Sequence, residues 1–225
     1  MLKAVWLGII VVILPLHVWG KEVTKLSLGQ YRVVAPSNHY WFSTVSGYYA
    51  NNDYKVKVTQ PLIKHDDGRK GAGNATLKLS LLNQWQKVYV DVHLKKKLAN
   101  AKSGVTLPVN DTSLSLEVSG FIWGGIGFIE LGYWWRQKTK FERTNSVYYS
   151  LGGVSSLKRW GFDKAWVAGL VVDHKPTSQG KLDRVASLLL QRKLNPSHKV
   201  TVTVGKGISD ESPDWITGLM WQKKY

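Results

Sequence analysis

The sequence predicts an all-β protein, an antiparallel up-and-down transmembrane β-barrel of about twelve strands. Three observations predict this fold. Apolar and polar side chains alternate with a period of two along almost the whole chain, the connections between these segments are short and long in turn, and aromatic residues gather near the ends of the segments. A soluble β-sandwich or a lipocalin-like barrel is the alternative that the period alone leaves open.

The alternation is clearest in residues 54–59. Tyr54, Val56 and Val58 fall on one face of an extended segment, whereas Lys55 and Lys57 fall on the other. The same pattern recurs in residues 75–81, 88–95, 113–119 and 200–205. A helical period would scatter these faces, so the segments are predicted to be strands with one apolar and one polar face.

The order of strands and connections predicts how the barrel is built. The predicted strands are 25–34, 40–49, 54–63, 75–83, 87–98, 112–122, 126–136, 146–157, 164–173, 184–194, 199–207 and 214–225. The short connections lie near 50–53, 84–86, 123–125, 158–163 and 195–198, and the long ones at 64–74, 99–111, 137–145 and 174–183. Short turns at one end and long loops at the other are typical of outer-membrane barrels, in which both termini face the periplasm.

Residues 1–20 are predicted to be an export signal. Lys3 is followed by the apolar run Ala4–Leu16. Residues 18–20, Val-Trp-Gly, then place short residues at the two positions that a signal peptidase recognises. We expect cleavage after Gly20 and a barrel domain over residues 21–225, with an uncleaved anchor as the alternative. Residues 25–49 do not reveal which face is which, so residues 21–39 could instead plug the barrel.

The composition excludes several classes of protein. The chain has no cysteine, which excludes disulfide scaffolds, thiolate metal sites and cysteine nucleophiles. It carries 31 Lys and Arg against 15 Asp and Glu. Basic side chains in the long loops are expected to contact the phosphates of an anionic outer leaflet such as lipopolysaccharide. The other expected partners are the barrel-assembly machinery and a small-molecule solute; we expect no nucleic acid, no cofactor and no metal.

Two belts of aromatic side chains are expected at the membrane interfaces, because an indole ring is apolar with one N–H group to hydrate. The belt at the short turns consists of Trp85, Trp123, Trp160 and Trp221, and the belt at the long loops consists of Trp41, Trp135 and Trp215. Tyr225 ends the chain on the same face as Leu219 and Trp221, as is common in outer-membrane barrels, although Lys223 interrupts this face.

The polar faces of the strands are predicted to line the lumen, where charged side chains set ion selectivity. The predicted lumen-lining residues are Lys55, Lys57, Lys78, Asp91, His93, Lys95, Lys97, Glu117, Glu130 and Arg136. Basic side chains outnumber acidic ones in this set, so the sequence predicts a preference for anions.

Two groups of side chains suggest other chemistry. Asp91 and His93 share a strand face, and Ser80 and Ser115 are expected on neighbouring strands, so a Ser/His/Asp arrangement is conceivable. No nucleophile-elbow sequence accompanies them, and we expect a hydrogen-bonded wall and no enzyme. Residues 65–67, His-Asp-Asp, could hold a cation, although a charged, glycine-flanked loop is usually only solvated.

Several short motifs resemble one family of barrels. Gln60-Pro61 followed by Gly71-Ala72-Gly73-Asn74-Ala75-Thr76-Leu77 resembles the strand end and the Gly-x-Gly-Asp hairpin opening of the MetA-pathway-of-phenol-degradation transporter family, with asparagine in place of the usual aspartate. Residues 205–215 resemble the last loop of these barrels, and Gly132-Tyr133 resembles a mid-barrel strand. The resemblance covers about residues 54–225. It implies an outer-membrane barrel and transfers no catalytic residue.

Together these observations predict a monomeric barrel in the bacterial outer membrane that acts as a porin-like channel for small solutes, anionic or aromatic. The alternatives are a non-conducting envelope barrel, either structural, adhesive or lipid-modifying, and a soluble secreted barrel that binds a ligand. A lumen of about twelve strands lies between filled small barrels and open porins, so the strand number does not decide between them.

Overall fold

A computed structural model describes residues 22–225 of the chain except 36–37, 86, 123, 140–141 and 178–182. The predicted signal peptide, residues 1–20, lies outside the described residues. No helix in the described part of the chain is both long and apolar enough to cross a membrane.

The described chain is built almost entirely of antiparallel strands. The strands are β1 (Val23–Ala35), β2 (Asn38–Ala50), β3 (Tyr54–His65), β4 (Lys70–Ala72), β5 (Ala75–Leu81), β6 (Gln84–Trp85), β7 (Val88–Leu98), β8 (Thr112–Ile122), β9 (Gly125–Trp135), β10 (Ser146–Ser156), β11 (Trp166–His174), β12 (Arg184–Lys193), β13 (His198–Gly207) and β14 (Trp215–Lys224). Because β4 and β6 are short extensions of three and two residues, twelve of the fourteen strands form the barrel wall.

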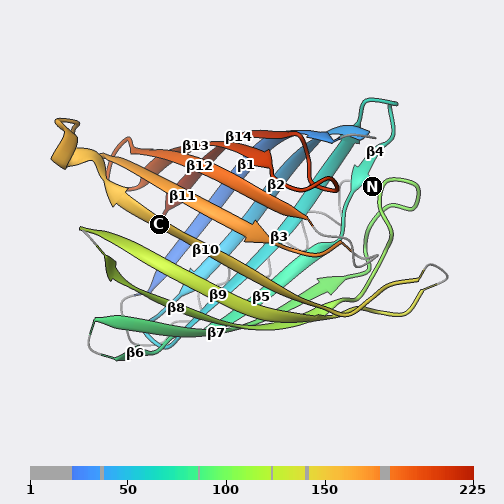
Figure 1. The fold of residues 1–225 in the computed structure, drawn as a ribbon, viewed down its shortest axis with the longest axis horizontal. Coiled ribbons are helices and arrows are strands. Elements are labelled where there is room, and N and C mark those ends of the chain that lie inside the picture. The colour runs from blue at the N-terminus through green and yellow to red at the C-terminus, as the bar shows by residue number, and fades with distance from the viewer. Residues whose placement is uncertain (1–21, 36–37, 86, 123, 140–141, 178–182) are drawn as a thin grey trace.

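The wall closes on itself, so the prediction of a closed barrel is confirmed. Each wall strand pairs with the next one along the chain, and β1 pairs with β14 from Lys25 opposite Lys224 to Val34 opposite Trp215. Figure 1 shows the strands tilted together around one lumen, with the η1 turn (Leu157–Trp160) among the connections at the left end and the longer loops at the right. Closure gives each of the twelve described wall strands a partner on both sides, so that none of them is an open sheet edge.

The observed strands differ from the predicted ones by at most a few residues at each end. The extensions β4 and β6 and the η1 turn were not predicted, because all three lie, apart from Leu157, in segments that the sequence assigns to connections and are too short for a period of two to show. The expectation that residues 21–39 could plug the lumen is wrong, because Val23–Ala35 is a wall strand whose two neighbours are β2 and β14. The two ends of the barrel domain meet, since the Tyr225 N–H donates to the Thr24 carbonyl at 2.9 Å.

The two faces of the wall have opposite polarity. On β8, Leu114, Leu116 and Val118 are 42–47% exposed on the outside, whereas Ser113 and Ser115 are at most 4% exposed on the inside. A soluble barrel fills its interior with apolar side chains and exposes polar ones to water. This barrel does the reverse, which is the arrangement that a hydrocarbon environment around it requires.

Candidate functional site: the charged lumen wall

The inner face carries lysines that lie directly opposite one another on neighbouring strands. Lys57 on β3 pairs with Lys78 on β5, and Lys78 pairs with Lys95 on β7. In the other direction Lys57 pairs with Tyr48 on β2, Tyr48 with Lys25 on β1, and Lys25 with Lys224 on β14. We call the five lysines the lysine row; its members are Lys25, Lys57, Lys78, Lys95 and Lys224.

The middle of the lysine row has no direct protein partner among the described residues. Directly opposite side chains on neighbouring strands have Cβ atoms roughly 5 Å apart, so like charges there repel. Within the described residues, Lys57 and Lys78 form no hydrogen bond or ion pair. The Lys57 side chain points into the lumen beside Tyr48 of β2 and is nevertheless exposed. Water therefore reaches this part of the interior. Glu117 and Glu130 act on Lys78 only through space, without a direct contact, and water and mobile anions complete the balance of charge.

Two members of the row are held by protein groups: Lys25, next to Lys224, by an aromatic ring, and Lys95, at the other end, by a carboxylate. The Lys25 Nζ atom lies over the Tyr48 ring at 4.8 Å from its centroid. The Lys95 Nζ atom donates to Glu130 Oε1 at 2.9 Å and to the Tyr148 hydroxyl at 3.3 Å. The cation–π contact fixes Lys25 while leaving its charge in place.

A second row of inward side chains carries the opposite charge. Asp91 on β7 pairs with Glu117 on β8, Glu117 with Glu130 on β9, Glu130 with Ser150 on β10, and Ser150 with Asp173 on β11. We call the four acids the carboxylate row; its members are Asp91, Glu117, Glu130 and Asp173. The two rows meet on β7, which supplies both Asp91 and Lys95.

Most of the carboxylate row is bound by protein donors. Glu130 is 8% exposed and accepts from Lys95 Nζ at 2.9 Å, from the Ser115 hydroxyl at 2.6 Å and from the Tyr148 hydroxyl at 3.2 Å. Gly132 makes this cluster possible, because a Cβ atom there would lie 2.5 Å from the Tyr148 ring. The Ser150 hydroxyl donates to Asp173.

The remaining predicted lumen residues lie at different heights. Lys55 is directly opposite Ser80, near the short-turn end of the barrel. Lys97 lies near the long-loop end, with its Nζ atom 3.8 Å from Asp111. Arg136 follows the end of β9 and belongs to the mouth, where it donates to Ser146 at 3.2 Å and to the Pro176 carbonyl at 2.7 Å. Sequence reasoning missed Lys25 in the wall, because residues 25–49 do not show their faces.

The mouth at the long-loop end is fastened by one buried acid. Asp111 is fully buried and accepts from both terminal nitrogens of Arg143, at 2.6 and 2.7 Å, and from the Gln137 N–H at 3.1 Å. Burial alone would raise the pKa of Asp111, but the hydrogen bonds from Arg143 and Gln137 and the nearby Lys97 charge hold this pKa below its ordinary value. The loops are therefore anchored around a charged, fully paired carboxylate.

The alternative cation site at residues 65–67 is not assembled. The His65 ring bonds Asn38 and the Val105 carbonyl, at 3.0–3.2 Å and 3.1 Å. Asp66 accepts from Arg32 at 2.6 Å in a bidentate pair, and Asp67 accepts from Arg69 at 2.7 Å. The three side chains thus serve different partners, and the Arg32 hydrogen bond holds the pKa of Asp66 below its ordinary value.

The Ser/His/Asp arrangement is not assembled either. Ser115 donates to Glu130 rather than to an imidazole, and the His93 Nε2 atom lies 3.2 Å from Glu117 Oε2. The Ser80 hydroxyl has no hydrogen-bond partner among the described groups.

The predicted interface aromatics divide between the two ends. Trp41, Trp135 and Trp215 lie at the long-loop ends of β2, β9 and β14 and are 41–47% exposed. Trp160, in the η1 turn, and Tyr225 are 78% and 65% exposed at the other end. Trp221 faces outward near that end and packs on His198 with ring centroids 5.3 Å apart. Trp85 lies in β6 with its side chain outside the description, and Trp123 lies outside the described residues.

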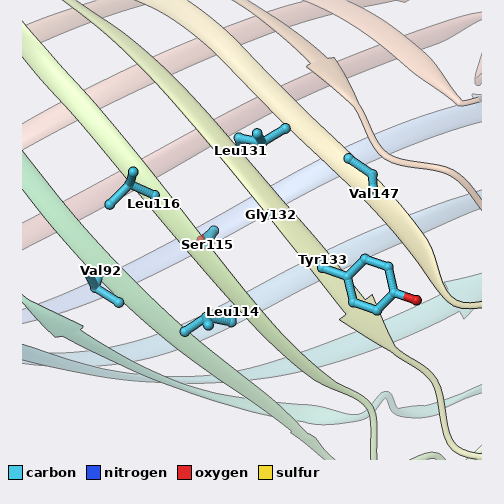
Figure 2. A pocket seen from close by; sticks show the side chains of 8 residues that line it. All are labelled: Val92, Leu114, Ser115, Leu116, Leu131, Gly132, Tyr133 and Val147. Carbon is cyan, nitrogen blue, oxygen red and sulfur yellow. The ribbon is translucent and has the colours of Figure 1, made fainter.

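The outer face has one apolar hollow, formed by β7 to β10. Its volume is about 440 Å³, and Figure 2 shows its lining side chains standing on four adjacent strands. The lining residues are Val92, Leu114, Ser115, Leu116, Leu131, Gly132, Tyr133 and Val147. The hollow lies between outward residues that are predicted to meet lipid, and it is lined by apolar side chains of all four strands.

Solved channel structures share this fold. An outer membrane channel from Pseudomonas putida F1 superposes with a TM-score of 0.65 at 9% sequence identity, over 92% of this chain and 96% of that chain. The CymD monoaromatic hydrocarbon channel superposes with a TM-score of 0.53 at 10% identity, over 90% of this chain and 88% of that chain. At such identities the likeness shows the fold alone. No protein-family model and no curated protein matches the chain.

Proposed function

We propose that the protein is a channel in the bacterial outer membrane that conducts small anionic solutes along the lysine row. The single observation that carries the proposal is the register of that row. Lysines from β14, β1, β3, β5 and β7 follow one line across the inner wall, with Tyr48 of β2 between Lys25 and Lys57. The central two, Lys57 and Lys78, form no hydrogen bond or ion pair within the described residues. Charges confined beside a low-dielectric wall act more strongly on a passing ion than exposed charges do.

The membrane location is supported by the polarity of the wall. An outer face of leucine, isoleucine and valine and an inner face of serine, lysine and glutamate fit a barrel surrounded by lipid. Membership of the MetA-pathway-of-phenol-degradation transporter family is part of the same proposal. It rests on the motifs at residues 60–77 and 205–215 and agrees with a fold shared with a channel of Pseudomonas putida F1.

Aromatic rings beside the cations suit planar anions. Besides Tyr48 under Lys25, the Trp134 ring lies 4.9 Å from Lys97 Nζ and 6.0 Å from the Arg136 guanidinium. A solute with a carboxylate and a flat ring would find a cation and a stacking surface together at both ends of its path.

The location is tested by one pair of variants. Leu116→Arg puts a charge on the outer face in the middle of β8, which costs about 2–4 kcal/mol at the bilayer midplane and should sharply lower the amount of folded barrel in outer-membrane fractions. Ser119→Arg places the same charge on the inner face of the same strand and should have a smaller effect. Recovery of the unmodified protein as a soluble periplasmic protein would contradict the location.

The conduction itself is tested by planar-bilayer recording with the purified full-length mature chain. We expect discrete single-channel openings and, in a salt gradient, a reversal potential on the anion side. Absence of conductance would favour the non-conducting envelope barrel, and cation selectivity would remove the lysine row from the mechanism.

A further inference from the structure

We propose that Asp91, His93 and Glu117 form a binding site for a divalent transition-metal ion, of which Zn²⁺ is the test case, on the inner wall of the barrel. Asp91 and His93 are two residues apart on the same face of β7, and Glu117 on β8 lies directly opposite Asp91. Each residue offers a ligand atom, and these atoms all lie within 4.8 Å of one another.

The donor set and its spacing suit such an ion. One imidazole and two carboxylates are ligands that Zn²⁺ accepts, and three protein ligands leave one position for water or a solute. Ligand atoms on a tetrahedral Zn²⁺ are roughly 3.4 Å apart, given metal–ligand distances near 2.1 Å. His93 Nε2 and Glu117 Oε2 are 3.2 Å apart, so these two already have the required separation. A ligand oxygen of Asp91 lies within 4.8 Å of both.

A second observation points to a ligand at this place. The His93 side chain is 1% exposed, and its Nδ1 atom has no hydrogen-bond partner among the described groups. Directly opposite on β5, Ser80 is fully buried and its hydroxyl is also without a partner. A buried polar group left unpaired costs about 1–3 kcal/mol. The wall therefore holds two unsatisfied polar atoms beside the cluster.

The tautomer of His93 links the two unpartnered atoms, His93 Nδ1 and the Ser80 hydroxyl oxygen, to metal binding. Without an ion, a neutral His93 carries its proton on Nε2 to donate to Glu117, and Nδ1 is then a buried acceptor to which the Ser80 hydroxyl could donate only after a rotation. With an ion on Nε2, the proton moves to Nδ1, where a small rotation of the neighbouring Ser80 side chain would let the hydroxyl oxygen accept it. Metal-binding histidines usually donate their second N–H in this way.

The neighbouring charges leave the site available. Glu130, the next acid in the carboxylate row, is committed to Lys95, and Asp173 is committed to Ser150 and to Lys175, whose Nζ atom is 2.7 Å away. Glu117 is 26% exposed, so an ion can reach the cluster through the lumen. Lys78 is two residues from Ser80 on the same face of β5. Its positive charge would weaken the binding of a cation, but its side chain does not occupy the site. The inference needs only the inner wall and does not depend on conduction.

The test is Zn²⁺ binding to the refolded barrel without a histidine tag, measured by competition with a chromogenic chelator. We expect one ion per barrel, with affinity at least tenfold weaker in Glu117→Gln and in His93→Gln, and unchanged in Asp173→Asn, which removes a lumen carboxylate outside the cluster. Slower migration after boiling verifies that each variant is folded. If His93→Gln does not fold, Asp91→Asn replaces it, with weaker binding again expected.

Two results would overturn the site. One is absence of Zn²⁺ binding in the unmodified barrel at concentrations that saturate a control zinc protein. The other is equal affinity in the unmodified barrel, Glu117→Gln and Asp91→Asn. The ring nitrogens of His93 give an independent readout, since ¹⁵N shifts should move from the Nε2–H to the Nδ1–H tautomer on adding Zn²⁺.

Discussion

The lysine row and the carboxylate row lie on one continuous sheet and have the same backbone geometry, yet they differ in how their charges are satisfied. Glu130 has three protein donors within 3.2 Å, whereas Lys57 and Lys78 have no ion pair or hydrogen bond among the described residues. The first arrangement stabilises the wall, because paired groups in a low-dielectric interior are held firmly. The second leaves charge free to act on a solute. An inward position alone therefore does not make a charge available to a solute.

The largest effect is expected where the two rows meet. Lys95→Met removes the cation from Glu130, which is 8% exposed, and leaves a carboxylate with only two hydroxyl donors. Breaking a buried pair from one side costs about 3 kcal/mol, so the free energy of unfolding should fall by roughly that amount. Urea unfolding of the barrel in lipid measures it. A loss no larger than that of Lys78→Met would show that the pairing does not distinguish the rows.

A smaller, pH-dependent effect is expected at the mouth above both rows. The folded-state pKa of Asp111 lies below its unfolded value of about 3.9, so its contribution is complete above that pH and is lost as the pH falls through the folded value. The Gln137 amide, which donates to Asp111, should lose about tenfold in hydrogen-exchange protection between pH 6 and pH 3, after correction for intrinsic rates. Protection independent of pH would contradict this anchor.

Asp111→Asn provides the matched control for the mouth. It keeps the shape of the side chain but has no titrating group, so Gln137 should be weakly protected at both pH values. Retention of the strong, pH-dependent protection in this variant would mean that another group holds the loop.

The smallest effect is expected in the middle of the lysine row. Lys78→Met removes a charge that faces Lys57 and Lys95 and has no partner of its own. Relieving like-charge pairs contributes roughly 0.2–1 kcal/mol, so the variant should be slightly more stable than the unmodified barrel. A clear destabilisation in the same urea experiment would reveal a partner for Lys78 and would make the two rows alike.

The strands and their order were predictable because the period of two persists wherever one face meets lipid and the other meets water. Val56 and Val58 against Lys55 and Lys57 show directly which face of β3 is apolar and which is polar. In β1 the signal fails, because Gln30 and Arg32 stand on the outer face among apolar residues and Tyr31 and Val33 stand on the inner face. For that reason Lys25 was missed as the continuation of the lysine row.

The sequence could not predict which charged side chains pair with one another, for a different reason. Strand faces predict that Lys95, Glu117 and Glu130 all point inward, but which acid Lys95 reaches depends on register across two strands and on the space left by Gly132. Likewise, Arg136 was predicted to line the lumen. In the structure β9 ends one residue earlier, at Trp135, and Arg136 belongs to the loop cluster at the mouth. Contacts between distant segments decide these assignments, and periodicity carries no information about them.

The most direct test of the account is the reversal potential of Lys57→Glu with Lys78→Glu in a salt gradient. The matched control is Lys158→Glu with Lys164→Glu, which makes the same charge change at exposed positions in the short connections outside the lumen. We expect anion selectivity in the unmodified barrel, a shift toward cations in the lumen variant and little change in the control. A lumen variant that keeps the reversal potential of the unmodified barrel would contradict the role of the lysine row.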